Sequence, residues 1–127
     1  ERSGRLICVL GAAGGGRDRW KRPEMGAIAA RHCDEIILTD EDPYDEPSER
    51  IIEEIAFGCR QARPHIPVYR IPSRREAFRK AIAMARENDV VVATGKGSEQ
   101  WIHRARGSAE PWSDRRVAEE ELQKMEN

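Results

Sequence analysis

A glycine-rich turn bearing four cationic side chains is the part of this chain best suited to chemistry. The segment 11–23 follows an apolar, strand-like run, 6–10, and leads into residues with helical spacing. Backbone N–H groups at such a turn, and at the N-terminus of the helix after it, bind anions. The turn therefore predicts a carboxylate or phosphate site. We expect Arg17 to anchor it, because a guanidinium holds a carboxylate through two parallel hydrogen bonds. The cations are Arg17, Arg19, Lys21 and Arg22.

Two further loops place acids where strands are expected to end. Residues 39–46 carry five carboxylates in eight positions, and residues 95–99 combine two glycines with an acid. Acids of this kind accept hydrogen bonds from an ammonium group, and glycine lets a ligand approach the backbone closely. Together the loops predict a site for an amino group or another cation, in which Pro43 fixes its neighbours. The predicted site residues are Asp42, Tyr44, Gly95 and Glu99.

Each loop also has a plain structural interpretation. The basic turn can be a solvated surface loop, and the acids of 39–46 can serve the dipole of the following helix. Neither glycine segment is a P-loop, since Gly16 is followed by Arg17 and Asp18 rather than by lysine and a hydroxyl residue. No nucleophile and general base can be paired from their spacing, so we predict no catalytic residue. No spacing rule for metal ligands is met either, so we predict no metal ligand.

The elements that must position these loops alternate along the chain. Strands are expected at 6–10, 35–39, 68–71 and 89–94, and the last is apolar at consecutive positions, as in a strand covered on both faces. Helices are expected from Pro23 to His32, after Pro47, from the capping box of Ser73 and Glu76, and after Ser113 or Asp114. In the helix after Pro47 one apolar stripe is expected to be buried, and it consists of Ile51, Ile52, Ile55, Ala56 and Cys59. Residues 100–112 read as a hairpin or irregular arm turning at Gly107.

Alternating strands and helices predict a three-layer, Rossmann-like α/β fold with a mostly parallel sheet, to which a short antiparallel edge can belong. In such sheets ligands bind beyond the carboxyl ends of the strands. All three loops follow strands. We therefore expect them to form one site.

Composition narrows the classes of protein. The 127 residues suit a single soluble domain, 39% hydrophobic and 35% charged, and the net charge of -1 gives no general attraction to nucleic acid or membrane. No apolar run approaches the roughly 20 residues that span a bilayer, and no signal peptide is recognisable. Three cysteines without CxxC spacing argue against disulfides and zinc and for a cytoplasmic protein.

Taken in order, the motifs resemble the C-terminal domain of the Mur ligases, in the UDP-N-acetylmuramyl-tripeptide synthetase branch. Each motif alone is weak, but several in the family's order and spacing are specific, and they span nearly the whole chain. The matching segments are Gly14–Asp18, Lys21–Pro23 with Met25 and Gly26, Thr39–Tyr44, Gly95–Glu99 and Ser113–Arg115.

The resemblance implies one domain, 1–127, of an ATP-dependent ligase that adds an amino acid to a UDP-N-acetylmuramoyl-peptide in peptidoglycan synthesis. This domain would present the amino acid to an upstream central ATPase domain that uses ATP and Mg²⁺; the fragment alone would bind neither and be inactive. Arg17 would hold the distal carboxylate, and Gly95 and Glu99 the distal amino end. Asp42 and Tyr44 would stand at selectivity positions, and Lys21 and Arg22 would contact the cofactor.

Departures from the family pattern leave the amino acid open. Tyr44 stands where the family has the arginine associated with meso-diaminopimelate, and Asp42 adds a negative charge that favours a cationic side chain such as that of lysine. The resemblance also implies that the domain's first strand, the ATPase domain and the UDP-sugar domain lie outside the chain. Two other hypotheses remain: a stand-alone module for a nucleotide or phosphorylated metabolite, and a structural domain whose charged loops contact a partner protein.

Overall fold

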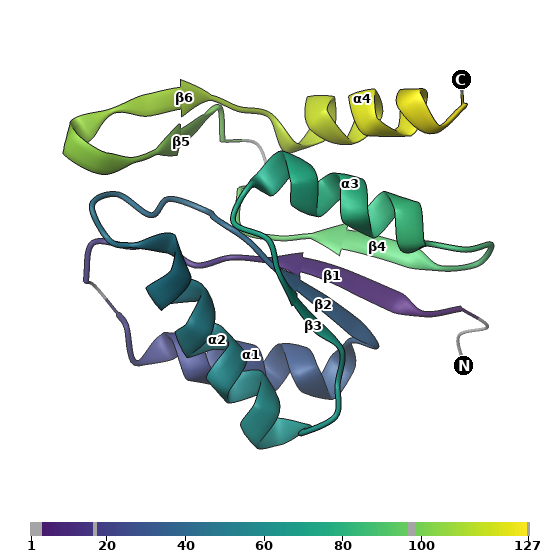
Figure 1. Ribbon diagram of the computed structural model, residues 1–127, viewed down its shortest axis with the longest axis horizontal. Helices are drawn as coiled ribbons and strands as arrows, with labels where there is room; N and C mark the ends of the chain where they lie inside the picture. Colours follow the sequence, from purple (N-terminus) through teal and green to yellow (C-terminus); the bar gives the residue numbers. More distant parts are fainter. Residues whose placement is uncertain (1–3, 17, 97–98, 127) are drawn as a thin grey trace.

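A four-stranded parallel sheet forms the centre of the computed structural model, which describes residues 4–16, 18–96 and 99–126. The strands are β1 (Leu6–Leu10), β2 (Glu35–Leu38), β3 (Val68–Arg70) and β4 (Val90–Ala93), in the order β3-β2-β1-β4. Helices α1 (Lys21–His32) and α2 (Ser48–Ala62) cover one face, and α3 (Arg74–Met84) and α4 (Asp114–Glu126) lie on the other (Figure 1). The predicted three-layer α/β fold is confirmed.

The two central strands are covered on both faces. Along β1, Ile7 and Val9 pack toward α3 and α4, while the alternate residues pack toward α1 and α2. All four residues of β2 are buried. This alternation divides the core into two apolar clusters, one on each side of the sheet, as expected for helices on both faces.

Strand β4 differs from its prediction. Its valines at 90, 91 and 92 are 48%, 37% and 38% exposed. Among the described strands, β4 pairs only with β1 and stands at the edge of the sheet. The prediction of burial on both faces is therefore wrong, because apolar character alone does not show whether a neighbouring strand and helix are present.

Helices α1 and α2 cross with their backbones in contact. A Cβ at Gly58 would lie 1.8 Å from the carbonyl oxygen of Pro23, and a Cβ at Gly26 would lie 2.0 Å from that of Ile55. Only glycine fits such approaches. The predicted apolar stripe of α2 lies beneath this crossing and is buried; it consists of Ile51, Ile52, Ile55, Ala56 and Cys59.

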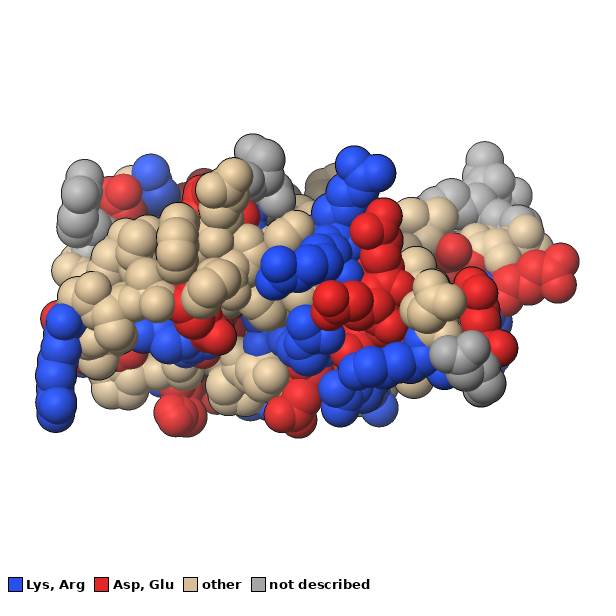
Figure 2. Space-filling view, turned by 90° about the horizontal axis from the view of Figure 1, so that it is seen from above, with Lys and Arg blue, Asp and Glu red and all other residues tan. Residues whose placement is uncertain are grey.

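Helices α3 and α4 begin at side-chain caps and join through ion pairs. Ser73 Oγ accepts from the N–H of Glu76, as the capping box predicted, and Ser113 Oγ accepts from the N–H of Arg116. Figure 2 shows basic and acidic side chains side by side on this part of the surface. Glu121 of α4 receives hydrogen bonds from Arg75 and Arg79 of α3, so the seam is electrostatic as well as apolar.

The predicted hairpin is confirmed, but it forms a sheet of its own. Strands β5 (Trp101–His103) and β6 (Ala109–Pro111) pair antiparallel and make no edge of the main sheet. They turn through 105–107, where Arg106 and Gly107 have positive φ. In Figure 1 the hairpin lies at the end of the molecule toward which β1 and β4 point.

A disulfide joins Cys8 of β1 to Cys33, the residue after α1, and corrects the expectation that no cysteines pair. The two residues are 25 apart in sequence, but the return of the chain from α1 into β2 brings their Cα atoms to 6.4 Å. Spacing along the chain could not show this proximity. Cys59 is free and buried, as expected. None of the described helices is long and apolar enough to cross a membrane.

Candidate functional site

The loops after β1, β2 and β4 meet at the carboxyl end of the sheet. The N–H of Gly14 donates to the carbonyl oxygen of Asp42 at 2.7 Å. Lys96 Nζ donates to Asp42 Oδ1 at 2.8 Å. One residue of the acid-rich loop is thus bonded to both glycine segments, so the three loops meet as expected, and their forming one ligand site stays a prediction.

The glycines of these loops admit close contacts within the protein. A Cβ at Gly14 would lie 2.0 Å from the carbonyl oxygen of Pro43. At Gly95, where φ is +106°, a Cβ would lie 2.6 Å from Glu41 Oε1. The close approach predicted at Gly95 is therefore made by the Glu41 carboxyl in this structure, and a ligand contact there stays a prediction.

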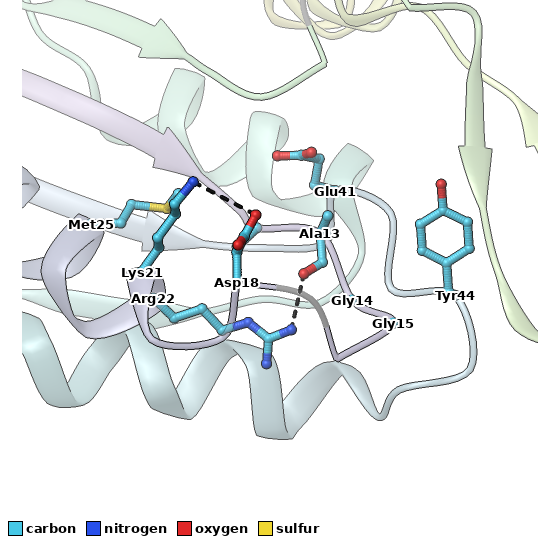
Figure 3. Close-up of a pocket in the computed structure, with 10 residues that line it drawn as sticks. Ala13, Gly14, Gly15, Asp18, Lys21, Arg22, Met25, Glu41 and Tyr44 are labelled. Carbon is cyan, nitrogen blue, oxygen red and sulfur yellow. Dashed lines mark hydrogen bonds and ion pairs between the residues drawn. The ribbon is translucent and has the colours of Figure 1, made fainter.

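A cleft of about 600 Å³ opens between the glycine turn, the start of α1 and the acid-rich loop (Figure 3). Tyr44 stands on its rim, 42% exposed, with its ring stacked on that of His103 at 5.5 Å. The N–H of Tyr44 also donates to the carbonyl oxygen of His103, which ties residue 44 to the hairpin, and its predicted role in selectivity stays a prediction. The lining residues with charged side chains are Asp18, Lys21, Arg22 and Glu41.

The two cations predicted to contact a cofactor differ in their freedom. Arg22 is 1% exposed and donates to Glu46, to Glu54 and to the carbonyl oxygen of Ala13. Its hydrogen bonds lower the pKa of Glu46 to about 2. Arg22 thus braces the glycine turn from below. The Lys21 side chain is 55% exposed, with Nζ 3.6 Å from Asp18 (Figure 3). A cofactor contact stays a prediction for both.

The acids predicted to receive an ammonium already share one. Lys96 Nζ lies 2.8 Å from Asp42 Oδ1 and 2.7 Å from Glu99 Oε1, and the lysine side chain is fully buried. Sequence-based prediction did not identify Lys96. The available signal was a lysine between two glycines directly after a strand, where a side chain reaches neighbouring loops. Because the buried ammonium neutralises Asp42, the extra charge at that position does not by itself favour a cationic substrate.

Glu41 is the second residue that sequence-based prediction missed. Its carboxyl lines the cleft, and among the described residues it makes no hydrogen bond or ion pair. Burial raises its pKa to about 7, and the charge of Asp42 adds to the increase, while Lys96 and Arg74 oppose it. A carboxyl of this kind can both accept from an ammonium and release a proton near neutral pH.

Three positions of interest lie outside the described residues. These are Arg17, the predicted carboxylate anchor, and Gly97 and Ser98 of the last loop. Within the described residues no group of three or more acidic, histidine or cysteine side chains could hold a metal ion.

A family model described as "Mur ligase, glutamate ligase domain" matches residues 1–97. The chain belongs to the Mur ligase family. The resemblance drawn from the motifs is therefore confirmed, and the contacts among the three loops are those of a Mur ligase chain.

Curated relatives and a solved structure agree. The chain is 45% identical over 119 residues, 94% of its length, to the UDP-N-acetylmuramoyl-L-alanyl-D-glutamate--2,6-diaminopimelate ligase of Chromobacterium violaceum, of which it covers 23%. It is 43% identical over 102 residues, 80% of its length, to the UDP-N-acetylmuramyl-tripeptide synthetase of Treponema denticola, of which it covers 19%. A solved structure of a UDP-N-acetylmuramoyl-L-alanyl-D-glutamate--2,6-diaminopimelate ligase superposes on the whole chain with a TM-score of 0.88 at 28% identity, and the match covers 25% of that structure.

Proposed function

We propose that this Mur ligase chain is the amino-acid-presenting, C-terminal domain of a cytoplasmic, ATP-dependent ligase that adds an amino acid to a UDP-N-acetylmuramoyl-peptide in peptidoglycan synthesis. The observation that carries the proposal is the meeting of three strand-end loops at one edge of the sheet, beside a cleft with Lys21 and Arg22 on one side and the Glu41 carboxyl on the other. The relatives named above are ligases of this class and span about four times the length of this chain.

The two sides of the cleft suit the two charges of an amino acid. The glycine turn, with Arg17 as its predicted anchor, would receive a carboxylate. Glu41, which lines the cleft, and Glu99, on the neighbouring loop outside its lining, would receive the distal ammonium, because the charge of Asp42 is neutralised by Lys96. Tyr44 would touch the side chain from the rim. A lysine or another diamino acid fits this arrangement, and the amino acid is the first quantity to measure.

ATP and Mg²⁺ would be held mainly outside this chain. The described residues offer no set of three metal ligands, and Arg22 has its terminal nitrogens committed to Glu46, Glu54 and Ala13. Of the two cations predicted to contact the cofactor, Lys21 is the one exposed enough to reach a phosphate oxygen. When bound, the nucleotide would activate the carboxyl group of the UDP-linked peptide. This chain's residues would orient the amine against it, and the upstream ATPase domain would supply the nucleotide site.

The purified 127-residue chain is expected to bind its amino acid and to show no ATP-dependent ligation. Calorimetry with L-lysine, meso-diaminopimelate and ATP measures the first property, and phosphate release with the UDP-linked peptide measures the second. Arg17→Ala should weaken amino-acid binding at least tenfold, since it removes the carboxylate anchor. Arg31→Ala, at an exposed arginine of α1, is the matched control and should change nothing.

Two results would count against this function. Ligation by the chain alone would show that a complete ATP site is present. Binding of ATP or another phosphorylated metabolite, with no binding of either amino acid, would favour the stand-alone binding module. Equal amino-acid binding by Arg17→Ala and the unmodified chain would remove Arg17 from its role.

We also propose that an upstream strand of the ligase pairs with β4. The N–H groups of Val90 and Thr94 donate to the β1 side of the sheet. The alternate amides, of Val91 and Ala93, therefore face the open edge, since parallel strands direct successive residues to opposite neighbours. In a longer fragment that includes the preceding segment, hydrogen exchange at Val91 and Ala93 should slow at least tenfold. Val90 and Thr94 are internal controls, and unchanged exchange at all four would contradict the pairing.

A further inference from the structure

We propose that Lys96 is a positioning residue of the amino-acid site: its buried ammonium neutralises Asp42 and fixes Glu99 by one oxygen, so that the other carboxylate oxygen of Glu99 faces the distal amino group of the substrate. The inference rests on the proposed function. It concerns how Asp42 and Glu99, on the two loops beside the cleft, are held in place, and it adds a residue that touches no substrate itself.

Lys96 connects two loops directly and reaches the hairpin through Asp42. Its Nζ donates to Asp42 of the acid-rich loop at 2.8 Å and to Glu99 of its own loop at 2.7 Å. The same Oδ1 of Asp42 accepts from the N–H of His103 at 2.9 Å, which brings in β5. A shift of Lys96 would therefore disturb the acid-rich loop, the last loop and the hairpin together.

The two acids held by Lys96 have different exposure, and this difference assigns their roles. The side chain of Asp42 is 10% exposed, whereas that of Glu99 is 56% exposed. Asp42 is thus an internal counter-charge. Glu99 stands at the surface, where a free glutamate would occupy many rotamers, and no described residue donates to its Oε2. The N–H of Glu99 also donates to the carbonyl oxygen of Lys96, so both the main chain and the side chain of Glu99 are bonded to Lys96.

The surroundings of Lys96 suit an ion pair within the protein rather than direct contact with a substrate. Its side chain is fully buried, and a buried ammonium is stable only when acids surround it. Hydrogen bonds and charge from Asp42 and Glu99 raise the pKa of Lys96 although burial lowers it, so the group stays ionised. A substrate ammonium would meet Glu99 from the solvent side, with Lys96 beneath it.

The test compares amino acids with and without the distal amino group in the full ligase. L-lysine is paired with L-norleucine, and meso-diaminopimelate with 2-aminopimelate; KM and kcat are measured for each. Lys96→Met should reduce the preference for the amino-bearing member of the accepted pair at least tenfold, through KM and with little change in kcat. Lys96→Arg, which keeps a cation at this position, should restore part of the preference. Lys80→Met, at an exposed lysine of α3, should leave it unchanged.

Since Lys96→Met leaves Asp42 buried without its partner, the double variant Lys96→Met with Asp42→Asn keeps the test valid if the single one fails to fold. An equal loss for both members of a pair in either variant would show a merely structural lysine and overturn the inference while the proposed function stands. Absence of ATP-dependent ligation of any amino acid to the UDP-linked peptide by the unmodified ligase would instead refute the proposed function.

Discussion

Replacement of Arg74 by methionine is expected to lower the free energy of unfolding by about 3–5 kcal/mol, the usual loss when one partner of a buried ion pair is removed. The Arg74 side chain is fully buried at the start of α3. Its Nε and one terminal nitrogen each donate to a different carboxylate oxygen of Asp114 at 2.9 Å. The terminal nitrogens also donate to the carbonyl oxygens of Asp40 and Thr94.

The loss is large because methionine fills the space but satisfies none of these acceptors. Asp114 would keep the hydrogen bond from Trp112 Nε1 at 2.6 Å, yet its charge would remain buried without a cation. Urea unfolding followed by circular dichroism measures the change. Arg60→Met removes a surface pair with Glu53 and should cost less than about 1 kcal/mol. If the two variants lose similar stability, Arg74 does not hold α3 to the strand-end loops as we describe.

Glu41→Gln is expected to make the chain more stable than the unmodified protein at pH 8 and to give no such gain at pH 5. Burial raises the pKa of Glu41 from 4.5 to about 7. A carboxyl with a raised pKa adds stability below its ordinary pKa and loses it as the pH rises through the folded-state value. The charged groups that act on Glu41 are Asp42 and Glu99, which raise its pKa, and Lys96 and Arg74, which lower it.

The full shift corresponds to roughly 3 kcal/mol, and solvent at the mouth of the cleft reduces the expected gain to about 1–2 kcal/mol. Urea unfolding at pH 5, 6, 7 and 8 measures the difference between variant and parent, in which the titration of other groups cancels. Glu87→Gln, at an exposed turn after α3, is the control and should give a flat difference. A flat difference for Glu41→Gln as well would mean that Glu41 titrates as an ordinary surface acid.

Much of the fold follows from local patterns in the sequence. The stripe of α2, the Ser73 cap of α3 and the hairpin turning at Gly107 all depend on neighbours within a few residues, and each was predicted. The meeting of the three loops also follows, because the carboxyl ends of parallel strands lie at one edge of the sheet. The glycines at the strand ends then indicate where the main chains of these loops pack too closely for a side chain.

The contents of the site depended on partners that local patterns do not specify. From the sequence alone, Lys96 is indistinguishable from a surface lysine, and only the fold brings Asp42 within hydrogen-bond distance of it. Glu41 is likewise one of five acids in its loop, and only the fold places its carboxyl against the backbone of Gly95. The Cys8–Cys33 disulfide and the exposed edge of β4 have the same origin. Each depends on a pairing between distant segments, so residue type and spacing alone could not give it.

The contact between Gly14 and Pro43 limits which positions of the site can change during evolution. Main-chain atoms of the two loops touch there, so position 14 accepts no side chain and neither loop can move without the other. Tyr44, by contrast, projects from a main chain that is held to His103. The side chain at 44 can therefore change while the main-chain framework beneath it is kept, provided that the new residue tolerates the positive φ of +53° found there.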